Sequence, residues 1–353
     1  MPRFSAKILL FGEYALLCGG EGLAIPYPDR SVIWQHSQPT VRRAPHIIQS
    51  QTALLGLAQY LRSHQEGGTL PFDADLSALV RDVQSGGYCA SDIPQGYGLG
   101  SSGAVTALLY DRYVRDKISI SLSELTAAYA AHQSQSHWAA LLAPLTHPTP
   151  IASPPTTSIE WQVGANLRRH LAFIEAYFHG SSSGIDPMVS YLGCPLLLNA
   201  NDVLPLPHLQ TSRMACSIVK PNTDLTQLTA ALCSQPTHQA SIFLYDSGLP
   251  RQTAPLVQAF CHRLHKEPDF AALCKQELTA LNRRCIAAYL AQDYTTLNTA
   301  WQQLSDFQYQ HFSALIPSGA LRQQWQQGKQ SGTYSLKLCG AGGGGFVLGW
   351  IGL

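Results

Sequence analysis

Glu175 and Asp186 are two carboxylates in different settings. Their residue types and their spacing would allow both to take part in one reaction. Glu175 falls within a predicted helix at residues 166–178, and Asp186 ends the Gly- and Ser-rich loop 179–186. One carboxylate could hold a hard cation such as Mg²⁺ while the other polarises an acceptor hydroxyl. The alternative is that Asp186 caps the following helix, with Pro187 at its first position, and this role is compatible with catalysis.

A glycine-rich segment at residues 94–104 leads directly into a second predicted helix. Glycines let the backbone approach a ligand closely, and the free N–H groups at a helix start favour an anion. Ser101 and Ser102 could cap the helix, donate to a phosphate or bind Mg²⁺. The segment is therefore a candidate phosphate site, and a plain glycine turn with a Ser N-cap is the alternative.

Two common nucleotide motifs are excluded for this segment. No Lys follows the glycines, so it is not a Walker A loop. Gly98, Gly100 and Gly103 have the spacing of a dinucleotide-binding turn, but no apolar strand precedes them and Glu124 lies in a predicted helix instead of at a strand end.

A further run of glycines, residues 340–345, separates the predicted strands 335–338 and 346–351. Successive glycines lose much backbone entropy on folding and offer no side chain to pack, and a hairpin needs only two turn residues. We therefore expect close approach of this backbone to a ligand or to another segment of the chain.

Together with the N-terminus, these loops resemble the GHMP kinases, a family that includes galactokinases and homoserine, mevalonate and phosphomevalonate kinases. The motifs are Ala6-Lys7-Ile8-Leu9-Leu10-Phe11-Gly12-Glu13-Tyr14-Ala15, Gly98-Leu99-Gly100-Ser101-Ser102, His179-Gly180 to Ser183-Gly184-Ile185-Asp186, and Gly340-Ala341-Gly342-Gly343-Gly344-Gly345. They occur in order along nearly the whole chain. The stretch 179–186 is most similar to the mevalonate kinases.

The resemblance implies roles for individual residues. Lys7 and Asp186 match the catalytic positions, while Ser102 and Glu175 fall where the family binds Mg²⁺. The residues that match the ATP-binding loops are Gly98, Leu99, Gly100, Ser101, Ser102, Gly103, Gly340, Ala341, Gly342 and Gly343. The residues expected at the acceptor are Glu13, Tyr14, His179, Ser183, Gly184 and Ser247.

The activity that the resemblance implies is ATP- and Mg²⁺-dependent phosphorylation of the primary hydroxyl of mevalonate, in isoprenoid precursor synthesis. Tyr14 and Gly103 depart from the His and Ala usual in mevalonate kinases, and both also occur in phosphomevalonate kinases. A phosphomevalonate kinase, for which Arg251 could supply an extra cation, therefore stays open. So do another GHMP kinase, a mevalonate-diphosphate decarboxylase and a ligand-binding protein without turnover.

The elements that must position these residues give a mixed α+β pattern. Residues 4–11 predict a strand, and a second element begins at Leu23 and is cut by Pro26 and Pro28. Ser121 or Ser123 would cap a helix at 121–145, and the Pro-rich residues 146–157 read as a linker. The other expected helices are 47–64, one from Val105 onward, 166–178, 254–266, 269–291 and 294–312, and the other expected strands are 216–220 and 241–245.

The family resemblance implies two domains with the active site between them. The first, at residues 1–187, would be S5-like and bind ATP, and the second, at 188–353, would be ferredoxin-like. A homodimer is left open.

Composition limits the classes of partner. With 45% hydrophobic and 13% charged residues the chain can fold around a core, and a net charge of +1 gives no basic field for nucleic acid or anionic membrane. We therefore expect a small-molecule alcohol as the partner, with neither nucleic acid nor membrane. The nine cysteines form no C-x-x-C pair, and neither a signal peptide nor a long apolar run is evident, so a cytoplasmic location is expected.

Overall fold

The structure of the chain is a computed structural model. It describes residues 2–38, 44–121, 123–127, 139–142, 159–200, 202–209, 216–221, 223–233, 241–251, 253–317 and 319–352. The expected linker at 146–157 and most of the expected helix at 121–145 lie outside these residues. Ser121 does begin a helical segment at 123–127, because Ser121 Oγ accepts the Glu124 N–H at 3.2 Å and the Glu124 carboxylate accepts the Ser121 N–H at 2.6 Å.

The first sheet is antiparallel and has its strands in the order β1-β2-β4-β5, with β3 paired to the far half of β2. The strands are β1 (Arg3–Phe11), β2 (Gly22–His36), β3 (Gly87–Ser91), β4 (Leu196–Leu198) and β5 (Val203–Pro205). The helices that accompany it are α1 (Pro45–Glu66), α2 (Leu76–Gln84), α3 (Ser101–Tyr113), α5 (Ala139–Leu142), α6 (Ile159–His179) and α7 (Ile185–Leu192), with a short 3-10 turn η1 (Leu16–Cys18).

The second sheet has the order β6-β7-β9-β8, in which only the β6–β7 pair is parallel. Its strands are β6 (Cys216–Val219), β7 (Ser241–Asp246), β8 (Ser335–Leu338) and β9 (Phe346–Ile351). Its helices are α8 (Leu225–Cys233), α9 (Thr253–Lys266), α10 (Pro268–Leu273), η3 (Cys274–Leu278), α11 (Thr279–Leu290), α12 (Tyr294–His311), η4 (Ser313–Leu315) and α13 (Ala320–Ser331).

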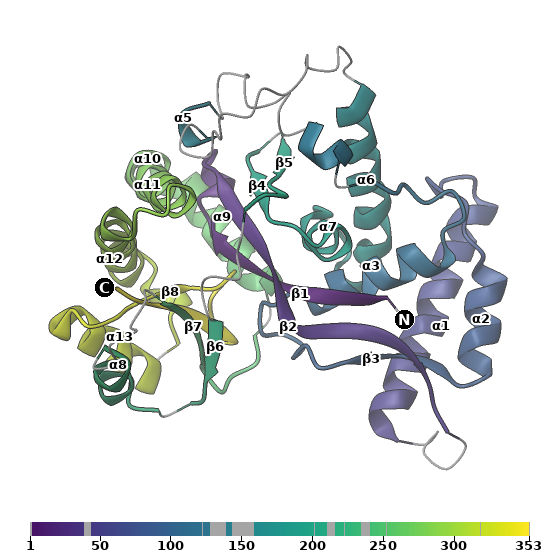
Figure 1. Cartoon of the computed structure of the whole chain (residues 1–353), viewed down its shortest axis with the longest axis horizontal. Coiled ribbons are helices and arrows are strands. Elements are labelled where there is room, and N and C mark those ends of the chain that lie inside the picture. Colours follow the sequence, from purple (N-terminus) through teal and green to yellow (C-terminus); the bar gives the residue numbers. More distant parts are fainter. Residues whose placement is uncertain are drawn as a thin grey trace.

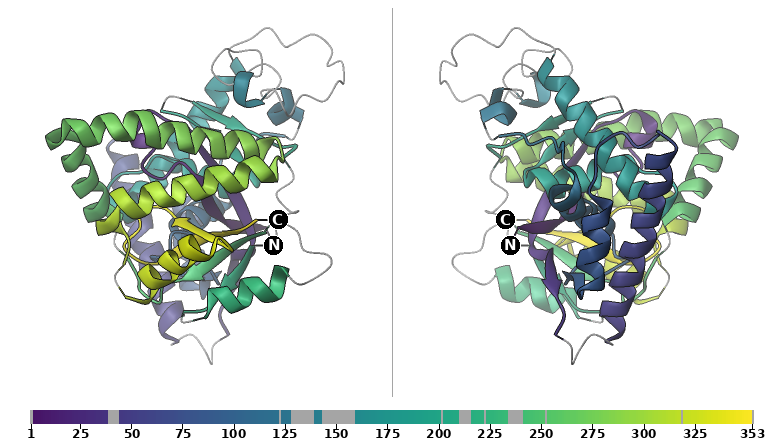
Figure 2. Two further views of the ribbon diagram at one scale, coloured as in Figure 1. Left: turned by 90° about the vertical axis from the view of Figure 1, so that its left-hand side faces the viewer. Right: turned by 90° about the vertical axis from the view of Figure 1, so that its right-hand side faces the viewer.

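Most helices of the two halves lie on opposite sides of the molecule with the strands between them, whereas the short α5 lies beside α10 and α11 (Figure 1). Helices α1, α2, α3 and α6 occupy one side, and α10 to α13 the other; the long, roughly antiparallel α11 and α12 are clearest in Figure 2. Phe11 at the end of β1 contacts Trp301 of α12 and Tyr289 of α11, with ring centroids 5.3 and 6.2 Å apart. Buried apolar side chains therefore connect the first sheet to the second set of helices.

The mixed α+β class is confirmed, and most of the expected elements are present. The strand 4–11, the helices around 47–64, 105–113 and 166–178, and the C-terminal strand–glycine–strand unit all form. The elements β3 to β5, α2, α8 and α13 were not expected. Because β3 pairs antiparallel with β2, the segment before the first glycines is a strand but not part of a parallel dinucleotide-binding unit.

The expectation that Pro26 and Pro28 end the second element is wrong, since β2 continues to His36. The register with β1 shifts from Ser5↔Ser31 to Ala6↔Tyr27, which leaves Pro28 in a bulge. Pro26 lies opposite Lys7, whose N–H donates to Leu99 O at 3.0 Å instead of to β2. A strand accepts proline at a bulge or where no ladder bond is needed.

The first sheet also extends further along the chain than the expected boundary at residue 187. Strands β4 and β5, at 196–205, pair with β2 and with each other. The division between the two sheets therefore falls after Pro205. Among the described helices, none combines the length and apolar character needed to cross a membrane.

Candidate active site

A cavity of about 930 Å³ lies where the first glycine loop, residues 96–100, meets elements from both halves of the chain. Its walls come from α1, β3, the starts of α3 and α7, the end of α6, the loop after β7 and the start of the C-terminal glycine loop, residues 340–345. Such a volume is within the range of small-molecule and cofactor sites. Of the predicted site residues, those that line it are Lys7, Gly98, Leu99, Gly100, Ser101, Ser102, His179, Asp186, Gly340 and Ala341.

Lys7 and Asp186 form an ion pair in this cavity, with Lys7 Nζ 2.9 Å from Asp186 Oδ1. The Lys7 side chain is 9% exposed and that of Asp186 34%, so the carboxylate is the more accessible partner. The N-cap residue of α7 is Gly184, whose N–H donates to Ser182 Oγ, so the alternative that Asp186 caps the helix is wrong. Asp186 instead lies in the first turn and directs its carboxylate to Lys7.

Glu175 receives hydrogen bonds from two serines in different segments. Ser102 Oγ donates to Glu175 Oε1 at 3.0 Å, and Ser182 Oγ donates to Glu175 Oε2. His179 Nε2 lies 2.9 Å from Ser102 Oγ, and the Gly184 N–H donates to Ser182 Oγ at 2.9 Å. The 179–186 loop is thus tied to the start of α3 both through the Glu175 carboxylate and through His179.

Burial raises the pKa of Glu175 to about 7, and the charge of nearby Asp186 adds to this shift. The hydrogen bonds from Ser182 and Ser102 and the charge of Lys7 lower the pKa but do not compensate. A nearby cation would stabilise the ionised form of such a buried carboxylate.

These residues fit a Mg²⁺ ion. Ser102 and Glu175 present oxygen ligands to one point, and Mg²⁺ is usually held by one or two protein oxygens with waters and phosphate oxygens completing its shell. Within the described ranges no three His, Cys, Asp or Glu residues gather as a metal cluster.

The first glycine loop is shaped for close approach. Gly98 and Gly100 have positive φ angles of 87° and 69°, and Gly100 is the N-cap residue of α3. Ser101 and Ser102 lie in the first helical turn instead of at the cap, so the alternative of a serine N-cap is wrong. Their hydroxyls and the free N–H groups of the helix start can therefore serve a ligand anion.

The C-terminal glycine loop packs mainly against protein. A Cβ on Gly342 would come within 2.5 Å of Leu315 O, and one on Gly343 within 2.6 Å of Leu256 Cδ1. Only Gly340 and Ala341 of this loop line the cavity. The expected close approach of the backbone is present, but at Gly342 and Gly343 it is to other segments, so their expected contact with ATP has no support here.

Arg251 joins the two glycine loops. Its Nη1 donates to Cys339 O at 2.5 Å, and its own N–H donates to Gly96 O at 3.3 Å. A Cβ on Gly98 or Gly340 would come within 2.3 or 2.6 Å of Arg251 Nη2. Its guanidinium therefore lies between the two glycine loops, beside Gly98 and Gly340.

Glu13 and Tyr14 are committed to internal contacts. Glu13 Oε1 lies 2.6 Å from Lys337 Nζ, and both side chains are at most 1% exposed. Burial raises the pKa of Glu13, and the charge of Lys337 opposes that shift. Tyr14 is also buried and donates from its hydroxyl to Ala341 O at 2.6 Å. The expected contact of these two residues with an acceptor is not supported by this geometry.

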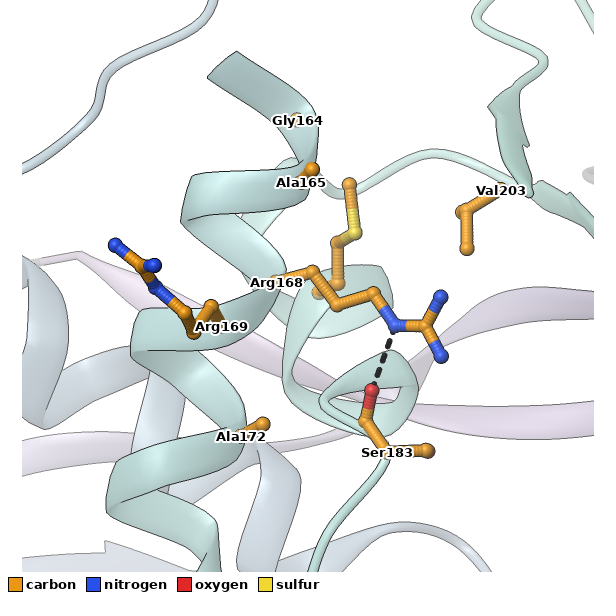
Figure 3. Close-up of a pocket in the computed structure, with 8 residues that line it drawn as sticks. Gly164, Ala165, Arg168, Arg169, Ala172, Ser183 and Val203 are labelled. Carbon is orange, nitrogen blue, oxygen red and sulfur yellow. Dashed lines mark hydrogen bonds between the residues drawn. The ribbon is translucent and has the colours of Figure 1, made fainter. Parts of the chain in front are cut away.

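Three other expected acceptor residues also lie outside the large cavity. Ser247 is in an exposed turn, where Leu249 N donates to its Oγ at 3.3 Å. Ser183 borders a smaller cavity of about 280 Å³ on the α6 side, where Arg168 Nε donates to Ser183 O at 2.7 Å (Figure 3). Gly184 packs against the Arg168 carbonyl. Ser183 and Gly184 therefore shape the 179–186 loop in this structure.

Several residues of the large cavity were not anticipated. His46, Gln49, Ser50 and Ala53 line it from one face of α1. Their spacing of three and four residues is the periodicity of a helix face, so a polar stripe on that helix is the signal that could have revealed them. Tyr88 and Ser91 line the cavity from β3, which was not itself expected.

Comparisons with known proteins agree with this architecture. No protein-family profile matches the chain. Mouse mevalonate kinase (Mus musculus) is 30% identical over 179 residues, which are 48% of this chain and 37% of the mouse protein. The matched part thus spans well under half of that relative.

Solved structures match over almost the entire chain. Mevalonate kinase of L. major, crystallised with R-mevalonate, superposes with a TM-score of 0.56 at 16% identity, covering 99% of this chain and 86% of the other. Mevalonate kinase of Methanococcus jannaschii gives 0.51 at 14% identity, covering 99% and 90%. The resemblance to the GHMP kinases is therefore confirmed in the fold: this chain has the fold of the mevalonate kinases.

Proposed function

We propose that this chain is a GHMP kinase that transfers the γ-phosphoryl group of ATP to the primary hydroxyl of mevalonate. The observation that carries the proposal is the Lys7–Asp186 ion pair, which lies in the cavity beside the glycine loop at the start of α3. A cation, an accessible carboxylate and a helix N-terminus at one place are what phosphoryl transfer to an alcohol requires. The fold of the mevalonate kinases supports the same assignment.

The chemistry needs positioning and charge stabilisation more than covalent participation of the protein. The acceptor oxygen forms a bond to the γ-phosphorus as the bond to the bridging oxygen of ADP breaks, and the hydroxyl proton leaves. Asp186 accepts or orients that proton. Lys7, 2.9 Å from Asp186, holds the carboxylate and stabilises charge on the transferred group.

The first glycine loop and Arg251 would hold the triphosphate, because N–H groups and a guanidinium converge there. Ser102 and Glu175 would hold Mg²⁺, which when bound neutralises charge on the phosphate oxygens. Lys7 N–H bonds to Leu99 O, so β1 and the glycine loop keep a fixed relation to each other. This bond would keep Lys7 beside the loop that we propose holds the nucleotide.

The charges of the cavity favour mevalonate over phosphomevalonate. Among the described residues that line it, Lys7 and Arg251 are the only permanently charged cations. Lys7 is paired with Asp186, and Arg251 lies between the glycine loops. A phosphorylated acceptor brings up to about two further negative charges, which usually call for additional Arg or Lys.

Release of ADP by the purified full-length chain tests the proposal against a binding protein without turnover. We expect ADP release that requires both Mg²⁺ and an added acceptor, with mevalonate the most effective of mevalonate, phosphomevalonate, homoserine and galactose. ATP binding with no ADP release on any of the four acceptors would contradict the proposed activity.

A further inference from the structure

We propose that the smaller cavity, on the α6 side of the 179–186 loop, is a second binding site and that its ligand is a short aliphatic carboxylate. This cavity has a volume of about 280 Å³ and is bounded by α6, α7 and β5 (Figure 3). None of the residues that line it also lines the large cavity. The inference therefore goes beyond the proposed kinase activity and does not depend on it.

The guanidinium of Arg168 is the feature of this cavity that points to an anion. Arg168 Nε donates to Ser183 O at 2.7 Å, whereas the terminal nitrogens Nη1 and Nη2 have no hydrogen-bond or ion-pair partner among the described residues (Figure 3). Burial lowers the pKa of Arg168, and no charged partner opposes this shift. A half-buried cation without a counter-charge has lost solvation, which a bound oxyanion would replace.

The described part of the cavity wall contains no Asp or Glu that could supply the missing counter-charge. Arg169 also borders the cavity, but its side chain is exposed and extends to the opposite side of α6 from that of Arg168 (Figure 3). Two arginines without a carboxylate give the described wall a net positive charge. The cavity therefore favours an anion over a neutral or cationic ligand.

The remainder of the wall is mostly apolar, which favours an anion with a hydrocarbon body. Met188 of α7 and Val203 of β5, both almost fully buried, line the cavity together with Ala165 and Ala172 of α6. Because one water takes up about 30 Å³ of the liquid, the cavity has room for about nine waters or for a small organic ion. A carboxylate can accept from two guanidinium N–H groups at once.

Inorganic phosphate fits this wall less well than a monocarboxylate does. Phosphate carries up to about two charges and is usually held by several donors. The described wall offers one half-buried guanidinium and the Ser183 hydroxyl. The part of α6 that lines the cavity, residues 164–172, lies beyond the first turn of that helix, so the helix start contributes no free N–H groups. A single charge on a short aliphatic chain matches the wall more closely.

NMR of the full chain with isotope-labelled methionine methyl groups tests the site, because Met188 lies in its wall. The chain has three methionines, and the signal lost in Met188→Leu identifies the Met188 methyl group. Butyrate is the probe, with chloride holding the ionic strength constant. We expect a saturable shift of the Met188 signal, half complete at about 1–10 mM butyrate, as suits one ionic contact and a few methylene groups. Butyramide, which has the same shape without the charge, should bind at least about tenfold more weakly.

Three variants separate this site from general effects of charge and folding. Arg168→Gln should weaken butyrate binding at least about tenfold, because it removes the charge-assisted contact. Arg62→Gln, which removes an exposed cation from α1, should leave the affinity within about twofold of the wild type. Since Arg168 also holds Ser183 O, Ala165→Leu is an independent test. It keeps Arg168 and fills part of the cavity, so it should also weaken binding at least about tenfold.

Several results would overturn the proposal. They are a butyrate shift that is still not saturated at about 100 mM, equal affinity for butyramide, higher affinity for inorganic phosphate, and wild-type affinity in both Arg168→Gln and Ala165→Leu. Displacement of butyrate by a non-hydrolysable ATP analogue would also overturn it, because the two cavities share no lining residue. Absence of ADP release from a chain that binds butyrate as described would instead contradict only the proposed kinase activity.

Discussion

Asp186 is held by three different parts of the chain at the scale of single residues. Lys7 of β1 pairs with its carboxylate, Gly103 of α3 faces its backbone, and Gly184 precedes it on the surface of α6. Each contact leaves the carboxylate directed at the cavity. These three contacts therefore constrain the position of Asp186 more tightly than a role in helix capping would require.

Asp186→Asn should abolish turnover while leaving nucleotide affinity nearly intact. The amide keeps the shape but cannot accept a proton, and loss of a positioned base costs at least about 10²-fold. The ATP-analogue dissociation constant should stay within about threefold of the wild type, because the Asp186 carboxylate pairs with Lys7 and the amide keeps its shape. Retention of more than about a tenth of wild-type kcat would remove Asp186 from the catalytic role.

The raised pKa of Glu175 predicts a pH-dependent effect on stability without metal. Because the folded-state pKa, about 7, exceeds the ordinary value of 4.5, the folded chain binds the extra proton between these limits. The contribution of this group to the free energy of unfolding therefore falls as the pH rises through that window. Glu175→Gln removes the titrating group, so the free energy of unfolding of this variant does not fall for this reason as the pH rises.

We therefore expect the Tm difference between Glu175→Gln and the wild type, variant minus wild type and measured in EDTA, to be at least about 2 °C larger at pH 8 than at pH 5. Thermal unfolding at the two pH values is the measurement, and exposed Glu66→Gln is the control. An equal difference between Glu175→Gln and the wild type at both pH values would show that Glu175 is not forced to titrate near neutrality.

At the scale of elements, the proposed metal ligands come from two helices that are far apart in sequence. Ser102 is in the first turn of α3, and Glu175 is in the last turns of α6. Their 3.0 Å hydrogen bond shows that the two helices meet at this point. The resemblance named both residues, but no local pattern could show that they touch.

Removing either ligand should weaken the use of Mg²⁺. Glu175→Gln and Ser102→Ala should each raise the Mg²⁺ concentration for half-maximal rate by at least about threefold, because each removes one oxygen from a sparsely held cation. A Mg²⁺ titration of the initial rate measures this, with Ser63→Ala in α1 as the control. Unchanged Mg²⁺ dependence in both variants would place the ion elsewhere.

Periodicity and glycine punctuation predict most of the long elements. The strand at 4–11 and the helices around α1, α3 and α6 follow from apolar spacing alone. Local rules were wrong where the pairing makes no demand on the proline nitrogen. Strand β2 continues because Pro28 lies in a bulge and Pro26 lies opposite Lys7, whose N–H is directed to Leu99 O and not to β2. The short strands β4 and β5 have too few residues to show a period.

The candidate site could be predicted only in part for the same reason. Motif positions identify Lys7, Ser102, Glu175 and Asp186, which the structure brings into one network. The same kind of matching does not reveal that Glu13 is neutralised by Lys337, 324 residues further along the chain. Burial and partner identity depend on tertiary packing, which a local motif does not encode.

At the scale of the whole molecule, two buried contacts connect the turn after β1 with β8 and with the C-terminal glycine loop. Glu13 pairs with Lys337, and Tyr14 donates to Ala341 O. Lys337 also donates to Leu338 O at 2.8 Å and lies 5.7 Å from the ring centres of Phe11 and Trp301. A buried cation therefore joins the turn after β1 to β8.

Lys337→Met should destabilise the fold, because it leaves the Glu13 carboxylate buried without its partner, at a cost of about 3–5 kcal/mol. Thermal or chemical unfolding should show a clear loss of stability. The double variant Glu13→Gln with Lys337→Met should be more stable than Lys337→Met alone, since it removes the isolated charge. If the double variant is no more stable than the single one, the ion pair is not the source of the loss.

The central claim is that the whole cavity is suited to an acceptor with a hydroxyl and one carboxylate, and its most direct test is the ratio of kcat/KM for mevalonate to that for phosphomevalonate. With Lys7 and Arg251 already engaged, the account predicts a ratio of at least about ten in favour of mevalonate, or about 1.4 kcal/mol in transition-state binding. A preference for phosphomevalonate would contradict it.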